Sequence, residues 1–264
     1  MLSESAQKII HDYFNLPFSN VNGVRCPYFN NARAGQRGQL RVLIGKGTPK
    51  EIVEEAKIIS TQYCKDLFDI NGMCCVHPKQ NERSETDCLR QFLIDNNLGI
   101  DCSGFVTQVL TSHFKETRDI NLPKMLLKKQ KLGFIKKLIT SLRPIENTNV
   151  RVYADNRCSD EIKITDTVAG DLITMLDTGS GNQHNHVLLI TENDNGLIKY
   201  VHSRAWSSEG KYGHGVTEGI IKIINPSAGA LEQEWVENEK NGEQNETFLE
   251  AKKARILRVR RIKI

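Results

Sequence analysis

Long apolar runs are absent from this chain of 264 residues. Its apolar stretches are short, as in Val187–Ile190, whereas a membrane-spanning helix needs about 18–20 such residues in a row. The start of the chain carries Glu4, Lys8 and Asp12 among its apolar positions, so it lacks the uninterrupted core of a signal peptide. The sequence therefore predicts no membrane span, no export signal and a cytoplasmic location, with release by lysis or non-classical export left open.

An excess of one sign of charge is also missing. The chain has 36 Lys and Arg against 32 Asp and Glu, a formal net charge of +4, and so mild a balance does not by itself indicate a nucleic-acid partner. A chain of this length buries roughly 70–75% of its unfolded surface. It therefore needs neither a disulfide nor a metal in order to fold.

No Cys-x-x-Cys pair occurs among the seven cysteines, and their number is odd. Without an export signal, this pattern indicates reduced thiols, as in cytosolic proteins. One thiol is left over in any scheme of disulfide pairing, so one cysteine is a candidate nucleophile. The seven are Cys26, Cys64, Cys74, Cys75, Cys88, Cys102 and Cys158.

Residues 1–85 are predicted to form a mainly helical N-terminal extension. Residues 4–14 carry apolar side chains at helical spacing. Thr48–Glu51 combines a capping box with a proline in the first turn, and Ser84–Asp87 has the spacing of a second cap. These signals predict helices that end near residues 66 and 97, whereas residues 26–38 are typical of a loop.

From residue 100 the pattern changes from helices to strands. A helix is predicted over 103–116, followed by a lysine-rich helical insertion near 120–143 that breaks at Gly133. Strands with turn residues between them are then predicted at 150–154, 172–175, 186–191, 197–202 and 219–224.

The last forty residues are unusually polar. Residues 226–250 predict an exposed acidic insertion with a short helix. Residues 254–264 are basic and β-like, which indicates either an edge strand or an RNA-binding tail. Helices followed by strands predict an α+β fold, with an antiparallel sheet packed against a few helices and a catalytic domain over 86–264.

Cys102 stands in the segment IDCSGFV. An extended segment ends at Asp101 and helical spacing begins at Phe105, so Cys102 is predicted at a helix N-terminus. The unpaired N–H groups and the helix dipole favour a thiolate there, and the same N–H groups can stabilise an oxyanion. The alternative is a buried structural cysteine.

Two histidines are placed to serve such a nucleophile. His186 opens the strand 186–191, His202 ends the strand 197–202, and a short turn joins the two strands as a hairpin. Both histidines then lie at the same end of the hairpin, where one can act as base and the other can orient its ring. Histidines with purely structural roles are the alternative.

These residues resemble the NlpC/P60 family of cysteine peptidases. The segment Asp101–Val106 matches the DCSGFV signature of that family, and Val168–Ile173 is similar to its PGDL segment. His186–Ile190 corresponds to the HVGIYI strand, and Val201–Ser203 to the site of the third polar residue. The segments follow the order of the family and cover about residues 88–224.

The resemblance implies a papain-like fold in which a helix bearing the nucleophile packs on an antiparallel sheet. It implies cleavage of peptidoglycan stem peptides beside D-glutamate through an acyl-enzyme, without metal or other cofactor. Cys102 would be the nucleophile, His186 the general base and then acid, and His202 the orienting residue. Asp101 and Ser103 match positions that contact the free amino terminus of the substrate, a peptide or peptidoglycan fragment.

The chain departs from the family before the signature. The tyrosine and the Trp-Gly-Gly that often precede it are replaced by Asp95–Gly99, and Ala169 stands where proline is usual. Two other functions remain open, namely an acyltransferase or transamidase on the same fold and a binding module without catalysis. The sequence predicts no oligomeric state.

Other motifs are weaker. Gly45–Thr48 lacks the GxxxxGK[ST] spacing of a phosphate-binding loop. Cys74, Cys75 and His77 lack a second pair of zinc ligands, and His184 with His186 lacks a third ligand. The lysine-rich helix fits either an anionic membrane surface or a helix with solvated lysines.

Overall fold

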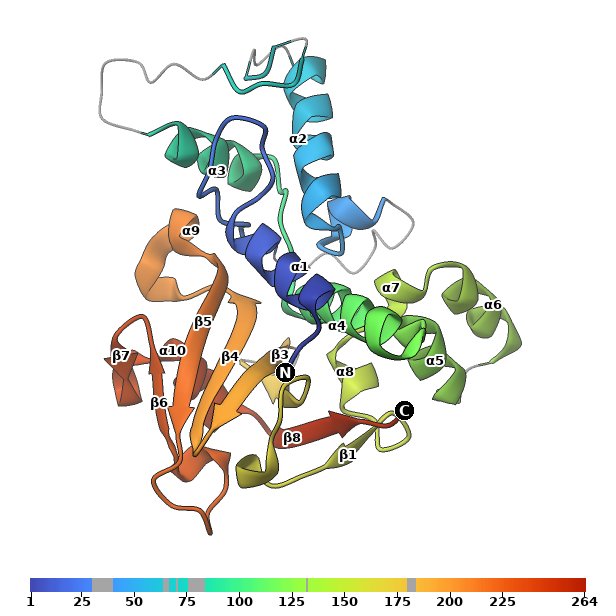
Figure 1. Cartoon of the computed structure of the whole chain (residues 1–264), viewed down its shortest axis with the longest axis vertical. Coiled ribbons are helices and arrows are strands. Elements are labelled where there is room, and N and C mark those ends of the chain that lie inside the picture. Colours follow the sequence, from blue (N-terminus) through green and yellow to red (C-terminus); the bar gives the residue numbers. More distant parts are fainter. Residues whose placement is uncertain (30–39, 64–66, 70, 76–83, 132, 180–183) are drawn as a thin grey trace.

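The structure is a computed structural model that describes residues 1–29, 40–63, 67–69, 71–75, 84–131, 133–179 and 184–264 (Figure 1). Helices dominate the first half of the chain and strands the second, so the predicted α+β class is confirmed. The helices are α1 (Glu4–Phe14), α2 (Pro49–Gln62), α3 (Glu85–Asp95), α4 (Cys102–Arg118), α5 (Leu122–Lys129), α6 (Phe134–Leu142), α7 (Pro144–Asn147), α8 (Val150–Tyr153), α9 (Gly210–Gly213) and α10 (Glu246–Lys253). Short 3₁₀ turns occupy Arg41–Ile44, Ile164–Asp166, Ser207–Glu209, Ala230–Glu232 and Gly242–Gln244.

Side-chain caps explain where the early helices begin. Thr48 accepts a hydrogen bond from the N–H of Glu51, and the Glu51 carboxylate accepts one from Thr48, so the predicted capping box opens α2. Ser84 accepts from the N–H of Asp87 at the start of α3, as predicted. The predicted loop over 26–38 lies mostly outside the described residues, as do Cys64 and His77.

The strand predicted at 150–154 is wrong, because this segment is the helical turn α8. The Asn149 side chain accepts hydrogen bonds from the N–H groups of Arg151 and Val152, and such a cap stabilises a helical start. Val150 and Tyr153 are buried in the core. Packing and capping therefore outweigh the β propensity of the two valines.

In the described residues, eight strands form one antiparallel sheet in the order β1-β8-β2-β3-β4-β5-β6-β7. β8 pairs with both β1 and β2, so the prediction of an edge strand at the C-terminus is wrong. Two of its basic side chains form ion pairs within the protein, since Arg258 pairs with Glu161 and Arg261 with Asp171. The strands are β1 (Ser159–Glu161), β2 (Leu172–Thr178), β3 (His184–Asp194), β4 (Leu197–Arg204), β5 (Gly215–Lys222), β6 (Glu234–Glu237), β7 (Lys240–Asn241) and β8 (Ile256–Ile262).

The sheet separates two apolar cores. Val187 and Leu189 of β3 pack in one core with α1 and α4, whereas Leu188 and Ile190 pack in the other, as the alternation of strand side chains requires. The first core joins Ala6 and Tyr13 to Phe105 and Val106, so it extends across the boundary expected at residue 85.

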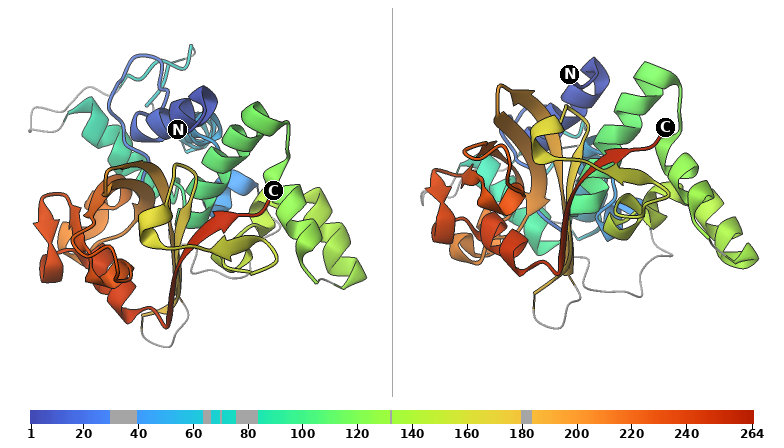
Figure 2. Two further views of the ribbon diagram at one scale, coloured as in Figure 1. Left: turned by 60° about the horizontal axis from the view of Figure 1, so that its bottom comes forward. Right: turned by 90° about the horizontal axis from the view of Figure 1, so that it is seen from below.

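The acidic segment 226–250 is not an exposed insertion. Its strands β6 and β7 extend the sheet, and Trp235 is 1% exposed in the second core beside Tyr200 and Ile221. Figure 2 shows this segment and α10 gathered at one end of the sheet. The segment has few apolar residues, but they are sufficient to anchor it, because one tryptophan buries a large apolar area.

The lysine-rich stretch breaks at Gly133 into α5 and α6, as predicted, and projects at the opposite end of the sheet (Figure 2). α5 buries Leu122 and Leu126, whereas Leu138 and Leu142 of α6 are exposed. Within the described ranges, no helix is long and apolar enough to cross a membrane.

Candidate active site

Cys102 is held at the start of α4 by an aspartate cap. The Asp101 carboxylate accepts a hydrogen bond from the N–H of Gly104 (2.5 Å), and the Asp101 carbonyl accepts one from Phe105 (2.9 Å). A Cβ at position 104 would overlap the carbonyl oxygen of Gly45. Asp101 and Gly104 are therefore structural requirements of this helix start.

A buried lysine forms hydrogen bonds with Asp101 and Ser103, the predicted substrate-binding residues. Lys46, 3% exposed, donates from Nζ to Asp101 Oδ1 (3.0 Å) and Ser103 Oγ (2.5 Å), and also to the carbonyl of Thr148 (3.3 Å). The Gly-Lys-Gly segment that resembles a phosphate loop is thus packed against the helix start. In this structure Lys46 contacts both side chains, and Ser103 Oγ also donates to Asp101 Oδ1 (3.0 Å).

The thiol of Cys102 lies where β3 and β4 separate. The paired part of these strands runs from Leu189–Val201 to the turn, and beyond it the start of α4 and the residues before it contact both strands. The Cys102 sulfur is 3.8 Å from the carbonyl oxygen of Asn185 and faces the N–H of Val187. On the β4 side, the Ser203 hydroxyl donates to the carbonyl of Ile100 (2.8 Å). The sulfur therefore lies beside the backbone on both sides of His186.

The structure brings His186 and His202 together. Nε2 of His186 is 2.6 Å from Nδ1 of His202, and Nε2 of His202 is 3.1 Å from a carboxylate oxygen of Glu237. The two rings meet edge to face at a centroid distance of 4.9 Å. Among the described residues, the sulfur of Cys102 contacts the Asn185 carbonyl and not a ring nitrogen of His186.

The electrostatics favour neutral reacting groups in the free protein. Burial raises the pKa of the Cys102 thiol to about 12, and Asp101 adds to the increase more than Lys46 opposes it. The expectation that the helix start favours a thiolate is therefore wrong for the free protein. Burial also lowers the pKa of His186 to about 4, against the opposing influence of Glu250. At neutral pH Cys102 is therefore a thiol and His186 a neutral imidazole.

Glu237 was not singled out from the sequence. It follows the buried Trp235 by two residues at the end of β6, and its side chain is fully buried. Burial alone would raise the pKa of Glu237, but His202 and Arg204 outweigh it and lower the pKa to about 2. The alternation of Trp235 and Glu237 on one strand is the signal that could have found this residue.

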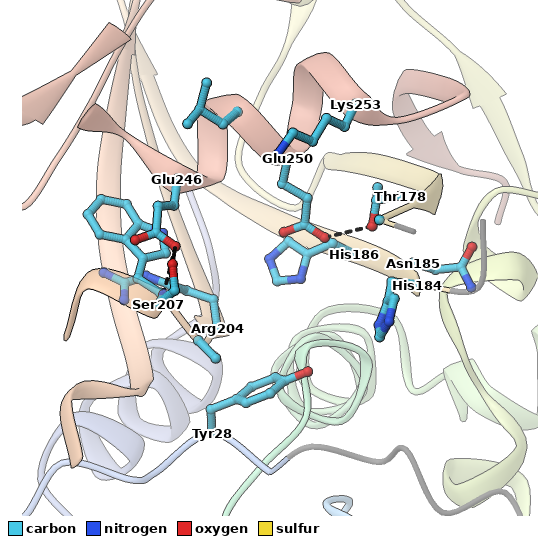
Figure 3. A pocket seen from close by; sticks show the side chains of 14 residues that line it. Tyr28, Thr178, His184, Asn185, His186, Arg204, Ser207, Glu246, Glu250 and Lys253 are labelled. Atoms are coloured by element: carbon cyan, nitrogen blue, oxygen red, sulfur yellow. Dashed lines mark hydrogen bonds between the residues drawn. The ribbon is translucent and has the colours of Figure 1, made fainter. Parts of the chain in front are cut away.

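A cavity of about 540 Å³ opens beside His186 (Figure 3). This volume lies within the roughly 300–1,000 Å³ that is usual for ligand pockets. Figure 3 shows Glu250 of α10 directed toward the His186 ring, and Glu250 accepts a hydrogen bond from Thr178 (2.9 Å). The pocket is lined by Tyr28, Thr178, Gly179, His184, Asn185, His186, Arg204, Ala205, Trp206, Ser207, Glu246, Leu249, Glu250 and Lys253.

Tyr28 is a second residue that the sequence did not indicate. It forms a parallel β-bridge with Ile100, two residues before Cys102, and its hydroxyl points into the pocket (Figure 3). Burial raises the pKa of Tyr28 well above its usual value, and Cys102 and Asp101 add to the effect. A tyrosine thus lies beside the DCSG motif in space, although none immediately precedes it in sequence.

In the part of the chain that the structure describes, no group of three or more His, Cys, Asp or Glu side chains is arranged to hold a metal ion. The cysteines described here are free thiols. Comparison of the chain with protein-family models, with curated proteins and with solved structures found no match.

Proposed function

We propose that this protein is a cysteine amidase or peptidase that cleaves an amide bond through an acyl-enzyme on Cys102. The observation that carries the proposal is the contact of the Cys102 thiol with the carbonyl of Asn185, the residue before His186 in β3, together with the hydrogen bond of the His186 ring to His202. A nucleophile next to a base that a third group orients is the arrangement required for nucleophilic catalysis.

In the acylation step, His186 takes the proton of the Cys102 thiol while the sulfur attacks the carbonyl carbon of the substrate. The C–S bond forms first, and the C–N bond then breaks as His186 gives the proton to the leaving amine. The hydrogen bond between thiol and base tightens only in the substrate complex of many such enzymes. Burial lowers the pKa of His186 to about 4, so the imidazole is neutral at neutral pH and has a free lone pair.

Donors for the oxyanion are present on two sides. The backbone N–H groups of Cys102 and Ser103 have no hydrogen-bond partner among the described residues, because they belong to the first turn of α4. The Tyr28 hydroxyl faces the pocket beside His186 and stays protonated at neutral pH, since its pKa is raised. Each such donor contributes on the order of 10²–10³-fold in the rate of acyl transfer.

In the deacylation step, water replaces the leaving amine. His186 removes a proton from the water as its oxygen attacks the thioester carbon, and it returns that proton to the departing sulfur. The products are a carboxylic acid and the free Cys102 thiol, so the protein returns to its starting state without a cofactor.

The proposed substrate is a peptidoglycan stem peptide, cut at the γ-D-glutamyl bond. The support is the resemblance of the Cys102, His186 and His202 segments to NlpC/P60 peptidases, together with the charges of the pocket. Such peptides carry both carboxylate and amino groups, and the pocket offers Lys253 and Glu250, which form no ion pair within the described ranges. Asp101 and Ser103 remain proposed substrate contacts, and their side chains would then have to bind Lys46 and the substrate at the same time.

The test is incubation with the tripeptide L-Ala-γ-D-Glu-diaminopimelate, followed by mass analysis. The expected result is L-Ala-D-Glu plus free diaminopimelate, with no product from the Cys102→Ala protein. Added hydroxylamine should divert the acyl group to a hydroxamate. Equal activity of the Cys102→Ala protein would refute the proposal, and transfer to an added amine in preference to water would identify a transamidase.

A further inference from the structure

Glu237 ends a buried chain of hydrogen bonds that begins at His186. One oxygen of the Glu237 carboxylate accepts a hydrogen bond from Nε–H of Arg204 (2.6 Å). The other oxygen accepts one from the Tyr200 hydroxyl (2.8 Å) and is 3.1 Å from Nε2 of His202. The side chains of Glu237 and His202 are both fully buried. An ionised carboxylate has no proton to donate, so every one of these partners must be a donor.

This requirement determines where the protons of both imidazoles lie. His202 must carry a proton on Nε2 in order to donate to Glu237, and a neutral His202 then has a bare Nδ1. Because Nδ1 of His202 is 2.6 Å from Nε2 of His186, His186 must carry its proton on Nε2. Its remaining nitrogen, Nδ1, is left with a free lone pair.

We infer that Glu237 is a positioning residue whose negative charge selects the tautomers of His202 and His186 and thereby makes Nδ1 of His186 the proton acceptor. The inference deepens the proposed function and rests on it. Nδ1 of His186 has no hydrogen-bond partner among the described side chains, and His186 lines the pocket. The free lone pair is thus available to a thiol or to water.

The charges around the chain favour a proton on this pair of rings during the reaction. Arg204 lies between the carboxylates of Glu237 and Glu209, to which it donates at 2.6 Å and 2.5 Å. These three groups carry a net charge of −1 while both imidazoles are neutral, and protonation of one imidazole brings the sum to zero. Glu250 faces His186 from α10, Tyr200 lies beside His202 on β4, and Cys102 and Tyr28 are the further titratable groups on the side of His186.

The decisive variant is Glu237→Gln. Arg204 can only donate, so the amide oxygen must take the position beside Arg204 and the amide NH₂ must face His202. Nε2 of His202 must then accept, its proton moves to Nδ1, and His186 is forced to carry its own proton on Nδ1. The variant keeps the size of the side chain but leaves His186 without a free lone pair on Nδ1, so that this nitrogen cannot accept a proton. The expected loss in acylation rate is roughly 10⁴-fold, the magnitude for a catalytic histidine held in the wrong tautomer.

Tyr200→Phe is the matched control. It removes one donor from the same oxygen of Glu237 and leaves the charge in place, so both tautomers should be retained and activity should fall less than about tenfold, as expected for one neutral hydrogen bond.

The direct readout is the ¹⁵N chemical shifts of the imidazoles in protein labelled at histidine. In the wild-type protein, His186 and His202 should both show a protonated Nε2 and a bare Nδ1, and in Glu237→Gln both should show the reverse. A bare Nε2 on either ring of the wild-type protein would overturn the inference even if the variant does not fold. If the shifts follow the expected pattern but no amide substrate is cleaved, the proposed function fails while the proton arrangement stands.

Discussion

Removal of the Lys46 charge should destabilise the helix start that carries Cys102. Lys46 and Asp101 are 3.0 Å apart, and their side chains are 3% and 9% exposed, so solvent does not screen the pair. Lys46→Met leaves the Asp101 carboxylate buried without its counter-charge. Breaking a buried pair on one side costs about 3–5 kcal/mol of unfolding free energy, and we expect a loss in that range.

The double variant Lys46→Met with Asp101→Asn separates charge from packing. The asparagine keeps an oxygen that can cap the N–H of Gly104, and no charge is left buried. We therefore expect the double variant to recover to within about 1–2 kcal/mol of the wild-type protein, since only neutral hydrogen bonds have been lost.

Urea unfolding followed by tryptophan fluorescence measures these differences, because Trp206 and Trp235 are 2% and 1% exposed and report on the packed state. A loss below about 1 kcal/mol for Lys46→Met, as small as that of an exposed ion pair, would show that Lys46 does not neutralise Asp101. A double variant less stable than Lys46→Met would lead to the same conclusion.

Three further predictions concern the reacting groups. His186→Gln should retain almost no turnover, whereas His202→Gln or His202→Asn should retain far more than His202→Ala, because an amide oxygen can accept from His186 while its NH₂ donates to Glu237. Comparison of initial rates checks this, and the opposite ranking would mean that the base and the orienting residue are interchanged. In the free protein at neutral pH, iodoacetamide should label exposed Cys75 before Cys102, which is 6% exposed and whose thiol has a pKa raised to about 12. Peptide mapping measures the order of labelling, and fastest labelling at Cys102 would contradict the assignment of Cys102 as a neutral thiol. The pKa of His186 is lowered to about 4, below the roughly 6.5 of an unfolded histidine. Between these two pH values the unfolded chain binds more protons, so the free energy of unfolding should decrease as the pH falls from about 6.5 to about 4. Urea unfolding at several pH values should show a shallower dependence of stability on pH for His186→Gln.

The sequence predicted the elements whose signals are local. The cap residues Thr48 and Ser84 mark helix starts through hydrogen bonds that span three residues, and the hairpin of His186 and His202 follows from two strands and one short turn. Such features depend on neighbours in the chain, which the sequence displays directly.

The parts that were missed depend on distant partners. Glu237 lies in a polar segment whose few apolar residues gave no hint that it extends the sheet, and its pairing with Gly219 of β5 is set by the fold. Tyr28 reaches the pocket through a bridge to Ile100, far along the chain. Lys46 neutralises Asp101 across a similar separation, so its role could not be derived from the motif in which it stands.

The position of β8 determines the order in which this protein can be completed. The last strand of the chain pairs with β1 and β2 in the interior of the sheet order, next to the strands that lead to the candidate site. A nascent chain therefore carries Cys102, His186 and His202 before β8 is available to close the sheet. Because long-range pairings of this kind form slowly, closure of the sheet around β8 should be a late step of folding, and removal of residues 256–262 should leave a chain that contains every predicted reactive residue but not the sheet that supports them.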